Sequence, residues 1–406
     1  MKTKLYLIMG CILFLQAPKA IAQCAGGRYI NQIFNDSIST VTYSTDTMLM
    51  DIYEPVGDTS SARPLIILAH EGSFVAGTDR TGDKTVDSFC ARFAKRGYVT
   101  ASIDYRLSTF TNMLSSDSTV PIDEVIKAVS DGKAAIRYFV KDRATSNYYK
   151  IDTNNIFIGG NSAGAVLYMH VAYLDSLGEC PSYIQSAMLA NGGFEGNSGN
   201  PGYTTKSRAV ISLAGGLNKV DFVGPGDKPS VNCQGDQDPI VPYYCAYPNF
   251  GTPTIPVNIQ VKLCGLGSLE PQYVAEGIYH WSMVFPGAGH VPWDANATEL
   301  NTIDSFVTQF LYNFVCGTAS VNQVNLNAEV SLFPNPASDV VNIKSSEFVN
   351  DITMYDETGR VVLQASGINK TDYEINTAHF SKGLYFVKMR FSNENNSPVV
   401  KRIVLE

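Results

Sequence analysis

The residues of this chain best suited to chemistry are Gly160-Asn161-Ser162-Ala163-Gly164, which form a G-x-S-x-G pattern. An apolar run, Ile156 to Ile158, precedes the pattern, and a helix-compatible stretch, Ala165 to Leu174, follows it. A strand, a sharp turn and a helix in this order lift a serine hydroxyl clear of a sheet, and the flanking glycines leave room for the bend. We therefore predict that Ser162 is a nucleophile. The alternative is a glycine turn whose serine has no chemical role.

A serine hydroxyl needs a base within hydrogen-bond reach, and His290 is the strongest candidate among the five histidines. It follows an apolar run, in a glycine-rich segment that can form a tight loop. In enzymes that present a serine on such a turn, the acid and then the histidine follow the serine along the chain. His70 precedes the serine, His170 falls inside the helical stretch, His280 flanks a strand-like run, and His379 lies near the C-terminus. We therefore predict His290 as the general base.

The base in turn needs a carboxylate that orients it. Asp236 and Asp238 both follow a strand-like run, Ser230 to Cys233, and both precede His290. From the residues alone either aspartate is a candidate, and the alternative is an acidic turn in which both only cap a loop.

A tetrahedral intermediate also needs backbone N–H groups around its negatively charged oxygen. The strand-like run Leu65 to Ala69 is followed by His70-Glu71-Gly72-Ser73-Phe74. We expect donors at the amides of Gly72 and Ser73, together with the amide of Ala163, the residue after the nucleophile. The alternative for the upstream segment is an ordinary turn from strand to loop.

The elements that must position these residues alternate between strand-like and helix-like segments from 48 to 316. Such alternation predicts an α/β fold with a mostly parallel sheet flanked by helices. The strand-like runs are Leu65 to Ala69, Tyr98 to Ile103, Asn155 to Ile158, Ala209 to Leu213, Ser230 to Cys233 and Trp281 to Phe285. The helix-like stretches are Val86 to Arg96, Asp123 to Val140, Ala165 to Leu174 and, closing the domain, Ala297 to Phe314.

Together these pieces resemble the α/β-hydrolase superfamily, and within it the carboxylesterase and hormone-sensitive-lipase-like branch, over residues 24 to 316. The motifs that carry the resemblance are His70-Glu71-Gly72-Ser73-Phe74, Asp104-Tyr105-Arg106-Leu107, Asp131 to Tyr138, the G-x-S-x-G pattern, Gly235-x-x-Asp238-x-x-Val241-Pro242 and Gly289-His290. The resemblance implies an α/β-hydrolase fold, hydrolysis of carboxylic esters through an acyl-enzyme, and no metal or organic cofactor. It also implies that Asp238, rather than Asp236, is the acid of the triad.

One position departs from the pattern of that superfamily, whose motif usually reads His-Gly-Gly-Gly or His-Gly-Gly-Ser. Here Glu71 replaces the first glycine. If this position requires a positive φ, Glu71 is strained and the amides after it are displaced.

The segment between the acid and the base is long for one connection between neighbouring strands, because Asp238 and His290 lie 52 positions apart. Within it, Tyr243 to Glu276 carries proline, glycine, aromatic residues and two cysteines. We interpret it as an insertion over the active site, either a lid or a wall of the acyl pocket, and the alternative is a decorated surface loop. The polar stretch Ser108 to Pro121 is expected to flank the same opening.

The N-terminus has the form of a signal peptide, residues 1–22. Lys2 and Lys4 precede an apolar run, Leu5 to Leu15, and Ala20-Ile21-Ala22 is a small-x-small cleavage site. No later apolar run approaches the ~20 residues of a membrane span, so none is expected in the mature chain. A lipoprotein anchored at Cys24 is the alternative, although Gln23 stands where a small residue is usual.

Composition narrows the class of protein further. The chain has 406 residues, 45% hydrophobic and 17% charged, which is enough for a large core, and its formal net charge of −8 argues against a nucleic-acid partner. Seven cysteines remain after the signal peptide, and all of them lie before residue 317. Export makes disulfides plausible, and because the count is odd at least one thiol stays free. The cysteines show no paired C-x-x-C spacing, so a zinc site is not expected.

Composition changes after Cys316. Residues 317–329 form an expected linker, and residues 330–406 show strands and turns only, which predicts a small all-β sandwich. This end of the chain resembles the type IX secretion C-terminal sorting domain of Bacteroidetes-type bacteria, on Phe333-Pro334-Asn335-Pro336-Ala337-Ser338-Asp339, Tyr355 to Val362, Gly383 to Lys388 and Lys401 to Leu405. The resemblance implies the type IX machinery as a partner and a secreted or surface-attached protein. A carbohydrate-binding or adhesion sandwich is the alternative.

The sequence thus predicts a signal peptide (1–22), an α/β-hydrolase domain (23–316), a linker (317–329) and a sorting domain (330–406). The predicted function is that of an exported serine carboxylesterase with an ester as substrate. One alternative is a polymer-directed esterase acting on acetylated or feruloylated polysaccharide or on polyester. Another, of a different class, is a surface binding protein on a hydrolase scaffold with a dead site.

Overall fold

The chain divides into two units, Met1–Thr318 and Ala319–Glu406, and each is described here by itself. The computed structural model describes residues 24–78, 83–251, 257–316, 330–356, 361–392 and 399–406. The expected signal peptide and the expected linker lie outside these ranges. None of the helices in the described ranges is long and apolar enough to cross a bilayer.

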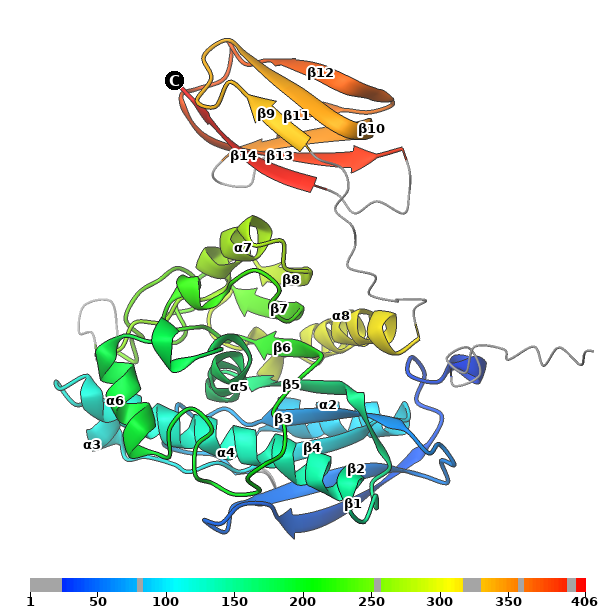
Figure 1. Ribbon diagram of the computed structural model, residues 1–406, viewed down its shortest axis with the longest axis vertical. Helices are drawn as coiled ribbons and strands as arrows, with labels where there is room; N and C mark the ends of the chain where they lie inside the picture. The colour runs from blue at the N-terminus through cyan, green and yellow to red at the C-terminus, as the bar shows by residue number, and fades with distance from the viewer. Residues whose placement is uncertain (1–23, 79–82, 252–256, 317–329, 357–360, 393–398) are drawn as a thin grey trace, which may run out of the picture. The chain divides into compact units, whose positions relative to one another are not determined.

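An eight-stranded sheet forms the centre of the first unit, in the order β1-β2-β4-β3-β5-β6-β7-β8 (Figure 1). The first two pairings, β1 with β2 and β2 with β4, are antiparallel, and every later pairing is parallel. The strands are β1 (Asn35–Thr42), β2 (Leu49–Val56), β3 (Arg63–Ala69), β4 (Val99–Ile103), β5 (Ile151–Asn161), β6 (Ala209–Leu213), β7 (Ser230–Gly235) and β8 (His280–Phe285). A mostly parallel sheet with helices between its strands is the predicted α/β-hydrolase arrangement.

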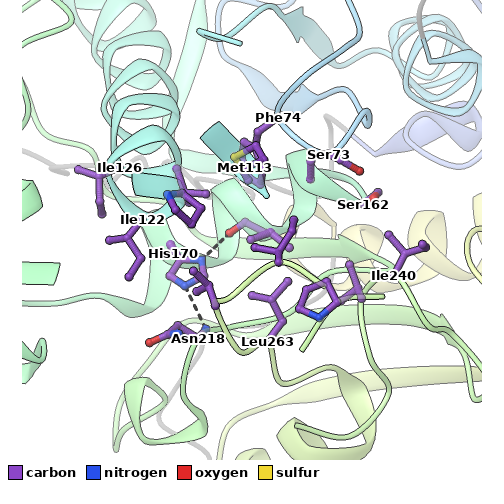
Figure 2. Close-up of a pocket in the computed structure, with 18 of the residues that line it drawn as sticks. Ser73, Phe74, Met113, Ile122, Ile126, Ser162, His170, Asn218, Ile240 and Leu263 are labelled. Carbon is purple, nitrogen blue, oxygen red and sulfur yellow. Dashed lines mark hydrogen bonds between the residues drawn. The ribbon is translucent and has the colours of Figure 1, made fainter. Parts of the chain in front are cut away.

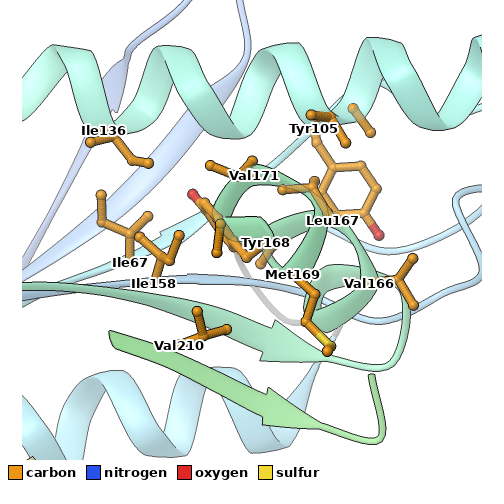
Figure 3. Packing of buried hydrophobic residues seen from close by; sticks show 14 of the residues in the cluster. Ile67, Tyr105, Ile136, Ile158, Val166, Leu167, Tyr168, Met169, Val171 and Val210 are labelled. Atoms are coloured by element: carbon orange, nitrogen blue, oxygen red, sulfur yellow. The ribbon is translucent and has the colours of Figure 1, made fainter. Parts of the chain in front are cut away.

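Helices cover both faces of this sheet, because the strand residues alternate between two cores. In β3, Leu65 and Ile67 face one core and Ile66 and Leu68 face the other. The first core includes α4 (Thr119–Ala144), α5 (Ala163–Tyr173), α6 (Ser182–Ala190) and α7 (Leu266–Ala275), and Figure 3 shows α5 packed on Ile67, Ile158 and Val210. The second core includes α2 (Lys84–Lys95) and α8 (Ala297–Val315). Shorter helices are η1 (Ala25–Gly27), α3 (Phe110–Met113), η2 (Leu177–Glu179), η3 (Val220–Phe222) and η4 (Pro292–Asp294).

Each of the six strand-like runs predicted for this unit falls on a strand from β3 to β8, whereas β1 and β2 were not predicted. The burial of β1 explains why its pattern is weak. It is an edge strand of polar residues, such as Asp36 and Ser39, and most of it is exposed. An edge strand held by backbone pairing needs no apolar run, so the sequence gives little sign of it.

Two disulfides link cysteines of this unit. Cys24 is joined to Cys316, near the start and the end of the unit, and Cys245 is joined to Cys264 within the segment before α7. The remaining three described cysteines, Cys90, Cys180 and Cys233, are buried free thiols, which agrees with the odd count. Because the sulfur of Cys24 is bonded to Cys316, it is not available for lipid attachment.

The second unit consists of antiparallel strands around a core of its own. Strand β10 pairs along its first part with β9 and β12, and along its second part with β11 and β13, which also pairs with β14. The strands are β9 (Val330–Phe333), β10 (Val340–Asp356), β11 (Val361–Ala365), β12 (Lys370–Asn376), β13 (Gly383–Phe391) and β14 (Val399–Leu405). Buried side chains from both parts, such as Ile343, Ile352 and Val387, meet in one cluster, as in a sandwich. Strand β10 is continuous although polar residues, Lys344 to Glu347, interrupt its apolar pattern.

Candidate active site

Ser162 lies at the turn between β5 and α5, in a conformation that few residues other than glycine adopt. Its φ is 50° and its ψ is −115°. The turn is tight because its neighbours have no room for side chains: a Cβ on Gly160 would lie 2.4 Å from the Ala69 carbonyl oxygen, and one on Gly164 would lie 2.0 Å from the same atom. The Ser162 amide donates a hydrogen bond of 2.8 Å to the carbonyl of Leu213 on β6. Sheet and glycines together therefore hold the serine in its strained position.

Ser162, His290 and Asp238 form a continuous chain of hydrogen bonds. The Ser162 Oγ lies 2.7 Å from Nε2 of His290, and Nδ1 of His290 lies 2.7 Å from Oδ2 of Asp238. The other oxygen of Asp238 accepts the amides of Ile240 and Val241, at 2.9 and 3.1 Å. Its side chain is completely buried, whereas the His290 side chain is 17% exposed. Three N–H groups thus fix the orientation of Asp238, and Asp238 fixes the ring that faces the serine.

Asp236, the competing aspartate, holds the backbone of the loop that carries His290. Its Oδ1 accepts the amide of Gly287 at 2.7 Å, and the next amide, that of Gln237, donates to the carbonyl of Ala288 at 2.9 Å. This loop follows β8, and Asp236 follows the neighbouring parallel strand β7. The two aspartates therefore have separate positions, one at the imidazole ring and one at the loop beneath it.

The segment after β3 has three consecutive residues with positive φ: Gly72 at 112°, Ser73 at 56° and Phe74 at 63°. Glu71 is not among the positive-φ residues, so the condition under which it would be strained is not met. Gly72 has to be glycine, since a Cβ there would lie 1.9 Å from the Ala76 carbonyl oxygen. The Tyr105 hydroxyl, which donates to the carbonyl of His70 at 3.0 Å, supports the segment from below.

The amides of Gly72 and Ser73 donate to no protein acceptor among the described residues. Ala163 is the first residue of α5, where an amide has no acceptor within its own helix. Ser73, Ser162 and Ala163 line the same cavity. The structure therefore brings the expected donors and the expected nucleophile to one site.

Three carboxyl groups lie beside this site, and two of them, Asp83 and Asp294, were not singled out from the sequence. Asp83 accepts the amides of Glu71, Thr85 and Val86, the last two as the N-cap of α2. Asp294, in η4, accepts the hydroxyl of Thr85 at 2.5 Å. Burial, together with the charges of Asp83 and Asp294, raises the pKa of Glu71 to about 8. Asp83 can be recognised from the sequence as an N-cap, because it directly precedes a helix. No local pattern joins Glu71 to Asp294, which follows it by more than two hundred residues.

Asn161, next to the nucleophile, connects the carboxyl groups to the turn. Its Nδ2 lies 3.5 Å from an oxygen of Asp83 and 3.4 Å from an oxygen of Asp294, and its Oδ1 accepts the indole N–H of Trp293 at 3.2 Å. No group of three or more His, Cys, Asp or Glu side chains within the described ranges has the arrangement of a metal site.

The histidines that were set aside as bases have other contacts. His170 on α5 donates from Nδ1 to the carbonyl of Val166 at 2.8 Å and accepts the amide of Asn218 at Nε2, at 3.1 Å. Burial lowers the pKa of His170 to about 4, so the ring is neutral near pH 7. His70 stacks on Tyr105 with ring centroids 4.3 Å apart, and burial lowers its pKa as well. Neither ring contacts the Ser162 hydroxyl.

A cavity of about 80 Å³ opens next to Ser162 (Figure 2). The segment Tyr243 to Glu276 supplies part of its wall, through Pro248, Phe250, Ile259, Val261 and Leu263, and the stretch Ser108 to Pro121 supplies Met113 and Pro121. The disulfide between Cys245 and Cys264 ties the two ends of this wall segment together. The long connection between Asp238 and His290 thus forms part of the wall of this cavity.

Two parts of the chain match models of known protein families. Residues 50–189 match the model of the BD-FAE family, an esterase family of α/β-hydrolase type, and residues 331–406 match the model of the secretion system C-terminal sorting domain. No curated protein matches the chain significantly. The chain therefore carries an esterase-type hydrolase domain and a type IX sorting domain, which directs it to the cell surface or the extracellular space.

Among solved structures, the chain is similar to a thermophilic esterase from the Planctomycetes species Thermogutta terrifontis. The native form has a TM-score of 0.48 and 16% identity, covering 71% of this chain and 95% of the other. The propionate-bound form has a TM-score of 0.49 and 16% identity, with 72% and 98% covered. The form phosphorylated by paraoxon has a TM-score of 0.45 and 18% identity, with 70% and 97% covered.

Proposed function

We propose that this protein is an exported serine carboxylesterase that works through Ser162, His290 and Asp238. The observation that carries the proposal is the chain of two 2.7 Å hydrogen bonds from the Ser162 hydroxyl through His290 to Asp238. A hydroxyl, an imidazole and a carboxylate in this order are the groups that nucleophilic acyl transfer requires.

In the first half of the reaction, Ser162 Oγ attacks the carbonyl carbon of the ester while Nε2 of His290 takes the hydroxyl proton. The carbonyl oxygen becomes an oxyanion, which accepts the amides of Gly72, Ser73 and Ala163. When the intermediate collapses, the bond to the alcohol oxygen breaks and His290 returns its proton to that oxygen. The alcohol leaves, and an acyl-enzyme remains on Ser162.

In the second half, water repeats the attack on the acyl-enzyme. His290 removes a proton from the water, the oxyanion forms between the same amides, and the acid is released as the proton returns to Ser162 Oγ. Throughout, Asp238 keeps Nδ1–H of His290 pointed at its own oxygen and stabilises the imidazolium that forms twice in each cycle. No step calls on a group outside the chain other than ester and water.

Replacement of Ser162 by alanine tests the assignment directly. Ser162→Ala removes one oxygen from a turn whose geometry is set by Gly160 and Gly164, so the fold should persist. We expect its hydrolysis of p-nitrophenyl butyrate to fall by a factor of about 10³ or more, toward the rate that binding and the oxyanion amides alone provide. Circular dichroism of the variant serves as the control for folding. Turnover close to that of the unmodified chain would exclude Ser162 as the nucleophile.

A surface binding protein with a dead site remains the competing function, and a fluorophosphonate probe separates the two. An activated serine reacts with the probe, whereas a serine with no working base does not. We expect covalent labelling of the unmodified chain and none of Ser162→Ala, measured by intact-protein mass.

We further propose that residues 330–406 engage the type IX secretion machinery, so that deletion of this segment should leave the esterase inside the cell envelope.

A further inference from the structure

Three segments that form walls of the cavity beside Ser162 also carry exposed apolar side chains. The segments are residues 107–122, which contain α3, residues 181–194, which contain α6, and residues 240–251 with 257–263. Each segment lines the cavity, through residues such as Met113, Ile184 and Pro248. The same segments expose to solvent a group of large apolar side chains, which we call the rim: Phe110, Leu114, Tyr183, Leu189, Tyr244 and Tyr247.

The first two segments lie next to each other at the start of α4. Glu124 of α4 accepts the side-chain amide of Asn112, on α3, at 3.3 Å. Asp123, its neighbour, accepts the side-chain amide of Asn191, directly after α6, at 2.7 Å. Figure 1 shows α3 and α6 at the same end of α4. The parts of the rim on these two helices therefore belong to one region of the surface.

A second set of contacts joins α6 to the third segment. The hydroxyl of Tyr183 lies 3.5 Å from the side-chain oxygen of Asn218, and the side-chain amide of Asn218 donates to the carbonyl of Lys262 at 3.0 Å. The ammonium group of Lys262 in turn lies 5.7 Å from the centre of the Tyr247 ring. The rim thus continues from α6 to Tyr247.

The three segments are almost free of charge. Asp117 and Lys262 are the charged residues in their sequence, although 17% of the whole chain is charged. Asp117 accepts the amide and the hydroxyl of Thr119, at 3.0 and 2.7 Å, so it is bonded within its own turn. Soluble proteins rarely gather exposed apolar side chains with so few charges between them, and such a patch marks an interaction site.

The chemistry of the rim selects among the partners that could cover it. A hydroxyl-rich polymer gives up hydrogen bonds to water when it lies on this surface, and leucine and phenylalanine side chains return none. An apolar phase gains free energy with every rim side chain that leaves water, because contact buries apolar area on both sides. The rim therefore fits an apolar surface better than a polysaccharide.

We propose that the rim is a docking surface for the surface of an aggregated, water-insoluble ester, so that the enzyme takes its substrate from an apolar phase. This inference rests on the proposed esterase function. Because the segments that carry the rim also wall the cavity, adsorption through the rim brings the cavity, with Ser162 lining it, against the substrate phase.

Adsorption is measured on the full chain with Ser162→Ala, because this variant should not consume the droplets of a tributyrin emulsion. The protein that leaves the aqueous phase when the droplets are removed by centrifugation is the bound fraction. Added to Ser162→Ala, Leu189→Ser and Phe110→Ser should each weaken adsorption about fivefold, since each takes an apolar side chain out of the contact.

Two exposed apolar residues outside the rim provide matched controls. Ile38, on β1, is 57% exposed and Tyr148, after α4, is 67% exposed, against 64% for Leu189 and 63% for Phe110. Neither control residue lines the cavity. Ile38→Ser and Tyr148→Ser should adsorb as Ser162→Ala alone does. All four substitutions are at the surface, so each should change the free energy of unfolding by less than about 0.5 kcal/mol.

Turnover gives a second readout, on chains that keep Ser162. For the unmodified chain, the rate of tributyrin hydrolysis should rise more steeply once the ester exceeds its solubility and droplets form. The ratio of the droplet rate to the rate on dissolved p-nitrophenyl acetate should fall about fivefold in Leu189→Ser and Phe110→Ser, and should stay constant in the two controls.

The outcomes separate this inference from the function on which it rests. A chain that reacts with a fluorophosphonate but does not adsorb to tributyrin, or adsorbs equally in rim and control variants, would overturn the docking surface and leave the esterase intact. The docking surface would also be overturned by retention on insoluble acetylated xylan that the rim variants lose, or by a dimer, seen by light scattering, that Leu189→Ser makes monomeric. If the chain adsorbs through the rim but neither reacts with the probe nor hydrolyses an ester, the proposed function fails and the docking surface stands.

Discussion

Two groups of carboxyl side chains flank the nucleophile turn, and they differ in what surrounds them. Asp238 accepts the His290 ring N–H and two backbone amides. Glu71 lies instead among other acids, since Asp83 and Asp294 are its electrostatic neighbours. The first group is a fixed acceptor for one imidazole. In the second, burial and then the charges of the neighbouring acids raise the pKa of Glu71 to about 8 and keep it largely protonated near pH 7.

The role of each carboxyl group follows from the groups around it rather than from its distance to the serine. Glu71 directly precedes Gly72. What links it to the site is the hydrogen bond from its backbone amide to Asp83, and not a role in the reaction. A protonated Glu71 can bond to Asp294 and so connect the segment after β3 with the η4 segment after His290. We infer that one group orients the base and the other braces the backbone that carries the oxyanion amides.

The largest effect expected is that of Asp238→Asn. The asparagine oxygen can still accept the backbone amides of Ile240 and Val241. Nδ1 of His290 then faces an NH₂ group or a weaker acceptor, and this disfavours the tautomer that accepts the serine proton. We expect kcat to fall about 10³–10⁴-fold with the fold intact. Asp236→Asn is the matched control, since its oxygen can still accept the Gly287 amide, and it should cost less than about tenfold. The reverse ranking would exchange the two aspartates.

A smaller effect is expected when the loop beneath the base loses its acceptor. Asp236→Ala leaves the amide of Gly287 without its 2.7 Å partner, so the turn that presents His290 becomes less ordered. We expect kcat/KM to fall about tenfold. Labelling by a fluorophosphonate should slow by a similar factor, because the serine is intact and only the position of the base has changed. A loss as large as that of Asp238→Asn would mean that Asp236 acts on the base directly.

The difference between the two groups also explains what the sequence could and could not predict. Ser162 and His290 were predicted because each follows a strand of a parallel sheet, and the ends of parallel strands meet at one edge. Position alone left Asp236 and Asp238 both open, and only the resemblance to the hydrolase superfamily favoured Asp238. Glycines at 160, 164 and 72 marked the positions where backbone approaches backbone. Such signals are local, and topology then brings them together.

The acid cluster could not be predicted in this way, because its members come from separate segments with no shared period. Asp83 could be recognised only as an N-cap, and Asp294 lies in a short turn. The sequence also left open whether Glu71 needs a positive φ, and the structure has positive φ at Gly72, Ser73 and Phe74 instead. Backbone torsions in a loop depend on contacts such as that of Gly72 with Ala76, which no local pattern encodes.

The smallest effect, and the one that addresses the acid cluster itself, concerns the pH dependence of stability. Because burial raises the pKa of Glu71 from 4.5 to about 8, the folded chain keeps a proton that the unfolded chain releases. The stability contributed by that proton is present below pH 4.5 and is lost as the pH rises to about 8. Glu71→Gln keeps a neutral side chain at every pH, so it should flatten this part of the curve. Since Glu71 is only partly buried, the expected gain in Tm near pH 8.5 is about 2–4 °C.

Thermal unfolding between pH 5 and pH 9 measures this difference, with the exposed Glu179→Gln as control. Glu71→Gln should lose less stability than the unmodified chain as the pH rises, and Glu179→Gln should follow the unmodified chain. Asp83 and Asp294 remain in all of these variants, so any difference in slope between them belongs to the substituted glutamate. An identical slope in Glu71→Gln would show that Glu71 is already ionised at neutral pH, and the contrast between a fixed acceptor at Asp238 and a protonated brace at Glu71 would then fail.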